Sequence, residues 1–535
     1  MVHAGKEQIN EISSLTRRHA SDFLKQICDY LSEKNPKFNW TGVYVLQGDK
    51  LALEAYHGEA TEHVSIKHFL IFHGYSQATG RPSMVNLHTL PGVANSMSFI
   101  HTARLNRTPL LITSGQQDRR HSFYEPILWH DLKSLVGNSV KYFYEVQGPA
   151  DIERSVKRAI SISMDPPRGP VFISFPMDVM DMDSDYVGLP ISDPNLDLLD
   201  LNSVKRVADL LENASNPAII AGFEVDLYGG HKELELLADK LGIPVFNEPL
   251  IHRAGYDSSG SNSGGDLQPA STAINLALLN NDFILSIGGD LTLYPYLPSP
   301  LLPGKKIITV SMEPSYRHGE YVKSNPRLFM KELISQVRKK GNYHSAPDPS
   351  LAGTIARERR NMGVTYVLQR AKKEFGNHVI VDEAISSSLL LRKNIGYRPN
   401  SYFSAKSGQL GWGLPAAAGI SMKNKKVLEI VGDGSIMYTI QTLWTISKYS
   451  LPVKILVLDN GGYGILKSYS KSFYPGLENA PYLTFNSDIL KIADAFGIES
   501  READPEIKEM NWLAEGDKPR MLVAHVPKTV QKLFP

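Results

Sequence analysis

Short apolar runs that end in glycine or a polar residue recur along the chain and predict buried strands of parallel sheets. Stretches with the spacing of amphipathic helices lie between them. We expect strands at residues 82–87, 109–113, 169–176, 217–222, 283–289, 379–383, 426–431 and 452–458, and helices at 67–79 and 231–241. Strands that alternate with helices are typical of an α/β fold, here with three Rossmann-like parallel-sheet domains.

Two polar, proline-containing linkers divide this pattern, at residues 189–200 and 339–349. The chain has 535 residues, which is too many for one hydrophobic core. The expected domains therefore span residues 64–188, 201–338 and 351–535. The middle block lacks a complete Gly-x-Gly-x-x-Gly motif, and this favours a scaffold domain over a dinucleotide-binding one.

The most informative motif follows two neighbouring strand runs in the last block. Gly432-Asp433-Gly434 ends the first run, and Asn460 follows the second, 27 residues after Asp433. The carboxylate of Asp433, the amide oxygen of Asn460 and the backbone carbonyl of Gly462 are hard ligands that suit Mg²⁺. Either half alone is also typical of a simple turn. Both halves together, each at a strand end, predict a metal-bound diphosphate.

The residues around Asp433 add a phosphate-binding feature to the metal ligands. Gly432 and Gly434 let the backbone turn tightly beside a diphosphate. A helix is expected to begin near Ser435, where its free N–H groups can face phosphate oxygens.

Composition excludes several classes of protein. The formal net charge is +1, which gives no electrostatic reason to expect nucleic acid or an anionic membrane as a partner. Cys28 is the only cysteine, so an intrachain disulfide framework and a cysteine metal cluster are excluded. The first residues lack an apolar signal peptide, and no run of 18 apolar residues is present. We expect a cytoplasmic protein.

From about residue 64 onward, the sequence resembles the thiamine diphosphate enzymes of the decarboxylase and acetohydroxyacid synthase superfamily, most of all the benzoylformate decarboxylases. The segments that carry this likeness are 74–82, 85–89, 114–117, 410–419 and 432–466. The resemblance implies a pyrimidine-binding domain at 64–188 with an incomplete N-terminus. It also implies a central scaffold domain at 201–338 and a domain for thiamine diphosphate and Mg²⁺ at 351–535.

The resemblance also implies roles for single residues in the last domain. Leu410 would support the bend of the cofactor; the alternative is an ordinary core leucine. Ser386 and Ser435 would contact the diphosphate, although hydroxyls at helix starts are often simple caps. Gly434 and Tyr463 would complete the cofactor-binding residues, together with the metal ligands Asp433, Asn460 and Gly462.

The expected catalytic residues are less regular. His88 matches the active-site histidine of benzoylformate decarboxylases in its Asn-Leu-His context and would move protons. A lone histidine in a loop is more often simply solvated. Ser65 stands where the superfamily has the glutamate that activates the cofactor, and a hydroxyl cannot replace a carboxylate there. Glu62 or Glu59 could serve only after a shift in register.

The first 63 residues differ from this pattern. Residues 38–56 predict a strand, a turn at Gly48-Asp49 and a second strand. This stretch is similar to the first half of a GAF domain of the free methionine sulfoxide reductase type, and we interpret residues 1–63 as a partial GAF-like segment.

The resemblance implies decarboxylation of a 2-keto acid with thiamine diphosphate and Mg²⁺, with or without carboligation. Two alternatives stay open. One is an acetolactate synthase-like or glyoxylate carboligase-like ligase, and the other is a cofactor-binding protein with impaired catalysis because Ser65 replaces the glutamate. In either case a homodimer or homotetramer is expected.

Overall fold

The computed structural model describes residues 40–47, 50–58, 69–183, 194–257, 259–289, 291–294, 299–314, 318–338, 341–345, 350–396, 398–423, 425–484 and 486–528. The chain forms two compact units, Met1–Pro194 and Asn195–Pro535. The division between them lies within the linker expected at 189–200. Each unit is described by itself.

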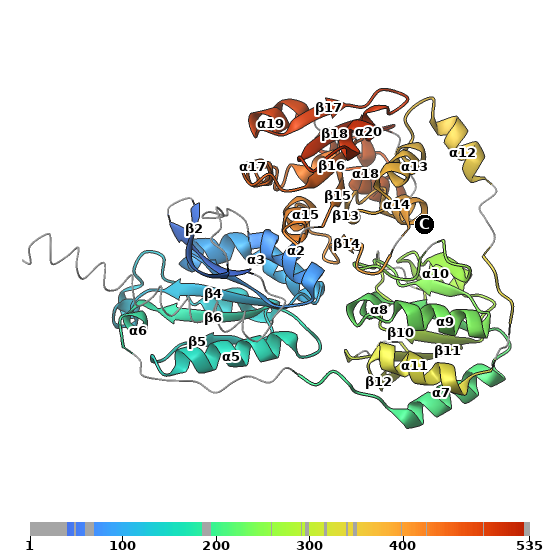
Figure 1. Ribbon diagram of the computed structural model, residues 1–535, viewed down its shortest axis with the longest axis horizontal. Helices are drawn as coiled ribbons and strands as arrows, with labels where there is room; N and C mark the ends of the chain where they lie inside the picture. The colour runs from blue at the N-terminus through green and yellow to red at the C-terminus, as the bar shows by residue number, and fades with distance from the viewer. Residues whose placement is uncertain are drawn as a thin grey trace, which may run out of the picture. The chain divides into compact units, whose positions relative to one another are not determined.

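A four-stranded parallel sheet in the order β3-β4-β6-β5 forms the centre of the first unit. Its strands are β3 (Ser83–Leu87), β4 (Leu110–Gln116), β5 (Phe143–Glu145) and β6 (Val171–Pro176). Its longer helices are α2 (Phe69–Thr79), α3 (Thr89–Leu105) and α5 (Asp151–Met164), and its short ones η1 (Arg119–Tyr124), α4 (Leu132–Val136), η2 (Gly137–Ser139) and α6 (Met177–Met180). Figure 1 shows α2 and α3 on one face of the sheet and α5 on the other.

The strand pair predicted near the N-terminus is confirmed. Strands β1 (Trp40–Gln47) and β2 (Lys50–Gly58) pair antiparallel as a separate two-stranded sheet. The predicted turn residues Gly48 and Asp49 lie outside the described residues, as do the remainder of the segment 1–63 and the positions Glu59, Glu62 and Ser65.

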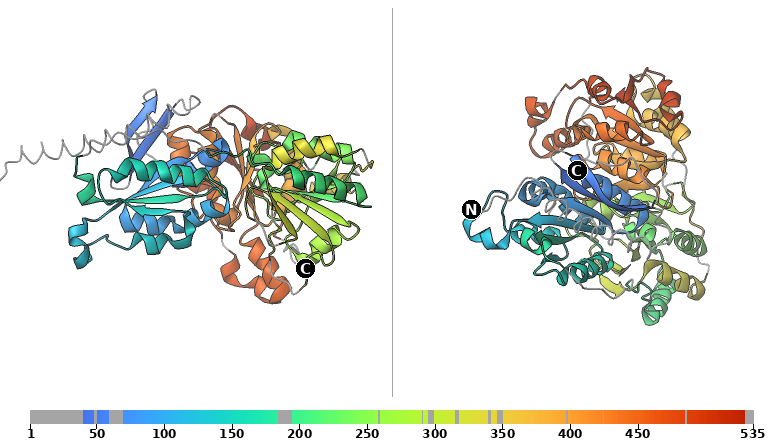
Figure 2. Two further views of the ribbon diagram at one scale, coloured as in Figure 1. Left: turned by 90° about the horizontal axis from the view of Figure 1, so that it is seen from below. Right: turned by 60° about the vertical axis from the view of Figure 1, so that its left-hand side comes forward.

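The second unit begins with a six-stranded parallel sheet in the order β12-β11-β10-β7-β8-β9. Its strands are β7 (Ala218–Ala221), β8 (Val245–Asn247), β9 (Ser263–Asp266), β10 (Phe283–Ile287), β11 (Lys306–Ser311) and β12 (Glu320–Lys323). Apolar side chains of α7 (Leu201–Asn213), α9 (His231–Leu241) and α11 (Pro326–Gln336) form one core on this sheet. Residues of α10 (Ser271–Ala277) contribute to a second core. The short helix α8 (Phe223–Leu227) follows β7, and Figure 2 shows helices packed along these strands.

A second six-stranded parallel sheet follows, in the order β14-β13-β15-β16-β18-β17. Its strands are β13 (Val379–Glu383), β14 (Tyr402–Ser404), β15 (Val427–Gly432), β16 (Val453–Asp459), β17 (Glu499–Glu502) and β18 (Arg520–His525). Its helices are α12 (Leu351–Glu358), α13 (Val364–Phe375), α14 (Ser388–Ile395), α15 (Gly413–Ser421), α16 (Asp433–Ile436), α17 (Thr442–Lys448), α18 (Gly464–Phe473), α19 (Ile489–Ala495) and α20 (Glu509–Ala514), with η3 (Leu477–Asn479) and η4 (Pro481–Leu483).

The two faces of this second sheet are covered by different helices. Ile380, Leu428 and Ile430 share a core with side chains of α13 and α20. Residues alternate between faces along a strand, so Val381, Glu383 and Glu429 point to the opposite face. Helix α15, in which every residue is buried, contacts β13 and β15. A face covered by such a helix is expected to be apolar, so its two glutamates need an explanation.

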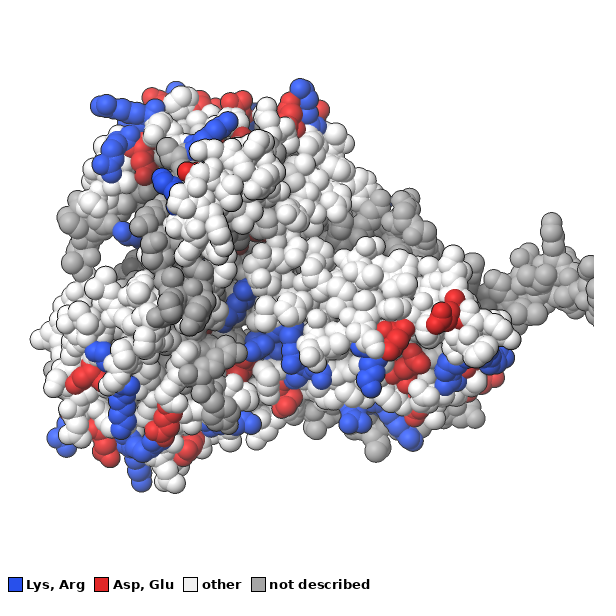
Figure 3. Space-filling model, turned by 180° about the vertical axis from the view of Figure 1, so that it is seen from behind, with Lys and Arg blue, Asp and Glu red and all other residues white. Residues whose placement is uncertain are grey.

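The three parallel sheets agree with the α/β fold predicted from the sequence. Among the described residues, no helix is both long and apolar enough to span a membrane. On the face drawn in Figure 3, Lys and Arg side chains alternate with Asp and Glu among the described residues.

Candidate cofactor site

The predicted metal ligands lie at the carboxyl edge of the second sheet of the second unit. Strands β13, β15 and β16 are neighbours there. Strand β14 lies on one side of β13 and β15 on the other, so the order of the strands along the chain reverses at β13. Open α/β sheets bind ligands at the carboxyl edge next to such a reversal. The edge that carries Asp433 and Asn460 is therefore the expected place for a ligand.

Asp433 is a buried carboxylate directly after β15. Its side chain is 3% exposed, and one oxygen accepts a hydrogen bond from the N–H of Gly462 at 2.9 Å. Burial, together with the nearby carboxylate of Asp459, raises the pKa of Asp433 to about 6. A bound cation would stabilise the ionised form that this environment disfavours. Such a carboxylate is a strong candidate for a metal ligand.

Asn460 supplies the clearest sign that a group belongs here. Its side-chain oxygen Oδ1 is buried and has no hydrogen-bond partner among the described residues. Its Nδ2 faces the hydroxyl of Ser386, which follows β13, at 3.4 Å. An unpaired buried oxygen is costly unless a cation or donor occupies the space beside it. The residues present therefore fit a divalent cation.

Gly462 joins the two halves of the motif. Its N–H contacts Asp433, and its carbonyl accepts a hydrogen bond from the N–H of Gly464 at 3.0 Å. A carbonyl oxygen has two lone pairs, so one remains for a cation. The structure therefore brings Asp433 and Gly462 into contact, with Asn460 two residues away. Among the described residues, no group of three or more His, Cys, Asp or Glu side chains is arranged to hold a metal.

The proposed diphosphate-binding residues surround these ligands. Gly434 and Ser435 are buried within α16, which begins at Asp433 rather than near Ser435 and has only four residues. The prediction of where this helix begins was off by two residues, because a strand end and a helix start share the glycines there. Tyr463 precedes α18, and burial and a hydrogen bond with Tyr438 raise its pKa. Gly464 packs directly on Asn460 and Ser386, with no space for a side chain.

The loop that carries Leu410 is held against the Asp433 segment. Leu410 is half-buried, and its carbonyl accepts a hydrogen bond from the side chain of Gln409 at 2.8 Å. Gly411 has φ +87°, and a Cβ there would lie 2.6 Å from Cβ of Tyr438. The carbonyl of Gly411 accepts a hydrogen bond from Thr439 Oγ1 at 2.8 Å. Tyr438 and Thr439 follow α16, so the structure brings the Leu410 loop to the metal-ligand segment.

Gly462→Ala is expected to disrupt this corner of the site. Gly462 has φ +144°, and an added Cβ would lie 2.2 Å from the carbonyl oxygen of Leu483. Strain of this kind costs on the order of 1–3 kcal/mol, and the overlap adds to it. We therefore expect a lower urea midpoint. Gly476→Ala is the matched control, because Gly476 has φ +101° but no atom within 4 Å of the added Cβ. Equal losses in the two variants would contradict the close contact at Gly462.

His88 lies in the first unit, at the carboxyl end of β3, where its side chain is exposed. The next residue, Thr89, has φ +31°, which is rare for a β-branched residue. The hydroxyl of Thr89 is buried and has no hydrogen-bond partner among the described residues. Strain and an unpaired polar atom often mark functional positions, so they support His88 as a candidate. The other predicted catalytic positions, Ser65 and Glu62, lie outside the described residues.

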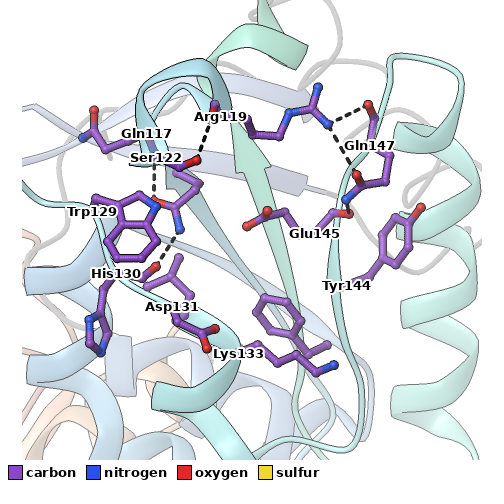
Figure 4. A pocket seen from close by; sticks show the side chains of 13 residues that line it. Gln117, Arg119, Ser122, Trp129, His130, Asp131, Lys133, Tyr144, Glu145 and Gln147 are labelled. Atoms are coloured by element: carbon purple, nitrogen blue, oxygen red, sulfur yellow. Dashed lines mark hydrogen bonds between the residues drawn. The ribbon is translucent and has the colours of Figure 1, made fainter. Parts of the chain in front are cut away.

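A pocket of about 490 Å³ also lies at the carboxyl edge of the first unit's sheet (Figure 4). Its walls include Gln116 and Gln117, which belong to one of the segments that carry the resemblance. Arg119 Nη1 donates to the carbonyl of Gln147 at 2.9 Å, and Gln116 Nε2 donates to the carbonyl of His130 at 2.8 Å. These hydrogen bonds join the end of β4 and the residues after it to the backbone of the segments at His130 and Gln147.

In the first sheet of the second unit, the loops that follow β7 and β10 pack closely against each other. The scaffold interpretation of the middle block stays a prediction. A Cβ at Gly222, after β7, would lie 2.0 Å from Cα of Gly289, after β10. The two loops therefore touch at the carboxyl edge of this sheet. Glu224 and Glu248 are buried beside this contact, and burial raises the pKa of Glu224 to about 8. Carboxyl groups there do not attract phosphate.

Three family models match the chain in order. The thiamine pyrophosphate enzyme N-terminal TPP binding domain matches residues 71–132, the central domain matches 204–333, and the C-terminal TPP binding domain matches 388–522. Thiamine pyrophosphate is another name for thiamine diphosphate. The chain belongs to the thiamine diphosphate-dependent enzymes. The GAF-like interpretation of residues 1–63 is not supported by the matching family models. A strand pair joined by a Gly-Asp turn is common to many folds, so this pattern was not specific.

The chain is similar to decarboxylases and to synthases of this family. It is 29% identical to benzoylformate decarboxylase from Pseudomonas aeruginosa over 80% of this chain and 84% of that protein. It is 25% identical to the acetolactate synthase large subunit of Parasynechococcus marenigrum over 86% and 81%. The crystal structure of benzoylformate decarboxylase from Polynucleobacter necessarius superposes with a TM-score of 0.78 and 26% identity, covering 86% of this chain and 90% of that one.

Sequence reasoning missed three acidic residues on the strands that lead to the site. Glu383 and Glu429 lie buried in β13 and β15, and Asp459 ends β16 beside Asp433. Asp459 also pairs with His525 at 2.8 Å. A charged residue inside an otherwise apolar strand run, as in Val427-Leu428-Glu429-Ile430-Val431, was the available signal. Such a residue shows that the position is unusual, but the sequence does not say which groups the buried carboxylate contacts.

Proposed function

We propose that the protein decarboxylates a 2-keto acid with thiamine diphosphate and Mg²⁺. The observation that carries this proposal is the unpaired buried oxygen of Asn460 next to the buried carboxylate of Asp433. Both follow neighbouring parallel strands, and a divalent cation would satisfy both. The relatives named benzoylformate decarboxylase and 4-hydroxybenzoylformate decarboxylase support decarboxylation as the reaction.

The chain's own residues would divide the work. Asp433, Asn460 and the carbonyl of Gly462 hold Mg²⁺, while Ser386 and Ser435 lie where they can bond phosphate oxygens. Leu410 supports the bent cofactor. When bound there, thiamine diphosphate would supply a nucleophilic carbon and an electron sink for the loss of carbon dioxide from the keto acid.

His88 is proposed to move protons on the substrate. We expect His88→Phe to lower turnover by about 10²-fold, since a positioned acid or base contributes at least that much. Cofactor affinity should stay unchanged, because His88 is not among the proposed metal or diphosphate ligands. Titration of cofactor binding and steady-state rates, measured on the same preparation, test both statements. His121→Phe, in the same unit and also exposed, is the control.

A carboligase is the second candidate, and the matches to acetolactate synthases favour it. Product analysis separates the two. The protein is incubated with thiamine diphosphate, Mg²⁺ and, in turn, pyruvate, benzoylformate and glyoxylate. Aldehyde from one substrate supports the decarboxylase, and a longer hydroxyketone or hydroxyacid product supports the ligase. Carbon dioxide release from none of the three would contradict both.

We also propose that the protein assembles as a homodimer or a homotetramer. In the superfamily, the pyrimidine-binding domain of one chain meets the diphosphate-binding domain of another. Large apolar side chains are unusually exposed in both units, with Phe123 88%, Ile127 87% and Tyr482 71% exposed. Such groups are typical of interfaces. Light scattering should give at least a dimer, and a monomer that turns over substrate would contradict this proposal.

A further inference from the structure

Two glutamates lie buried under the start of α15 and have no role in the proposed chemistry. Glu383 is 1% exposed at the end of β13, and Glu429 is 0% exposed in the middle of β15. A Cβ added at Gly413, the first residue of α15, would lie 2.7 Å from an oxygen of each. Both carboxyl groups therefore sit directly against the backbone that follows the Leu410 loop.

Glu383 uses both of its oxygens on that backbone. Oε1 accepts a hydrogen bond from the N–H of Gly411, and Oε2 accepts one from the N–H of Gly413 at 2.6 Å. Gly411 is the residue directly after Leu410. The N–H of Gly411 donates to Glu383, and its carbonyl accepts from Thr439. The peptide groups before and after Gly411 are therefore each fixed by a side chain.

Glu429 differs from Glu383 in its bonding. Neither of its oxygens has a hydrogen-bond partner among the described residues. Burial raises the pKa of both groups, and the nearby Glu383 raises that of Glu429 further. Backbone N–H groups lower the pKa of Glu383 in opposition to burial. Of the two, Glu383 is therefore the group that accepts hydrogen bonds from the backbone, and Glu429 accepts none among the described residues.

We propose that Glu383 is a positioning residue that fixes Leu410 beneath the cofactor by binding the N–H groups of Gly411 and Gly413. This inference rests on the proposed function, in which Leu410 supports the bent cofactor. A carboxylate suits the task because it presents two acceptors in one plane. An amide presents one acceptor and one donor, so it would oppose one of the two N–H groups.

Glu383→Gln tests this inference, with Glu429→Gln as the matched control. Both changes are of equal size, in neighbouring strands and equally buried. Hydrogen–deuterium exchange of the segment 405–413 is measured in the cofactor-free protein. We expect about 10- to 100-fold faster exchange in Glu383→Gln, since the amide loses one of the two acceptors and places a donor against a backbone N–H. Glu429→Gln should stay near the unmodified protein, because Glu429 accepts no hydrogen bond from a backbone N–H among the described residues.

A second measurement connects the loop to the cofactor. With thiamine diphosphate and Mg²⁺ added, Glu383→Gln should change the cofactor Kd by less than about threefold, because Asp433 and Asn460 are untouched. Exchange of the thiazolium C2 proton on the bound cofactor should fall at least about tenfold, since misplaced reacting groups cost rate more than binding. Glu429→Gln should change neither.

The inference would be overturned if the two variants showed equal amide exchange in the segment 405–413. It would also be overturned if C2 proton exchange fell equally in both. If Glu383→Gln does not fold, the unmodified protein decides: the Gly411 and Gly413 amides must exchange slowly, and fast exchange there overturns the inference. If the unmodified protein does not bind thiamine diphosphate, the proposed function fails. The exchange data from the cofactor-free protein still show whether Glu383 holds the loop.

Discussion

Asp433→Ala is expected to abolish Mg²⁺-dependent binding of thiamine diphosphate. Asp433 is the only charged group among the three proposed ligands, and a hard cation depends on such a ligand. Loss of a residue that merely supports a metal ligand costs about 10- to 100-fold in affinity, so the loss here should be at least about 100-fold. Isothermal titration with the cofactor, in the presence of Mg²⁺ and of a chelator, gives the measurement.

The fold of this variant should survive. The folded-state pKa of Asp433 is raised to about 6, so its ionised carboxylate destabilises the metal-free protein as the pH rises through that value. At neutral pH, its removal should not lower the stability of the metal-free protein. Asp517→Ala is the control, because Asp517 is 75% exposed and pairs with Lys426 just before β15. Unchanged cofactor affinity in Asp433→Ala would overturn the assignment of the metal site.

The strands that position this site were predictable because their signal is local. Strand β13 has the predicted bounds, and β15 and β16 are each shifted by one residue from the predicted runs. Apolar runs of this length can be buried only in a sheet covered on both faces, and glycine or asparagine ends them. Asp433 and Asn460 could thus be placed at one sheet edge from the sequence alone.

The rest of the site depends on contacts between distant segments. Glu383 precedes Gly411 by 28 residues, and nothing in either segment predicts their hydrogen bond. The positive φ of Thr89 could not be foreseen from the sequence, because a β-branched residue rarely adopts it. Short strands such as β5 and β14, of three residues each, have no periodicity to detect. These strands form because they pair with β6 and β13, and this pairing cannot be predicted from the local sequence.

Slow decarboxylation is the other large effect that we expect, and its cause is Ser65. By the resemblance, this residue, nine residues before Gly74, would stand in the place of the superfamily's activating glutamate. Loss of a positioned acid or base costs about 10²–10⁴-fold, so Ser65→Glu should raise turnover by an amount within that range. Cofactor affinity should change little, because the proposed metal and diphosphate ligands lie in the second unit. Ser65→Ala is the control and should leave the rate unchanged. Steady-state rates with benzoylformate, together with exchange of the cofactor C2 proton, provide the measurement.

A fast unmodified protein that Ser65→Glu slows would contradict this expectation in one of two ways. If Glu62 or Glu59 takes the place of the missing glutamate through a shift in register, Glu62→Gln or Glu59→Gln should lower C2 exchange by the same 10²–10⁴-fold. If neither variant does, the site works without a carboxylate at this position, as in the glyoxylate carboligase-like alternative. Ligation of glyoxylate should then exceed decarboxylation of benzoylformate, and product analysis with the two substrates measures this ratio.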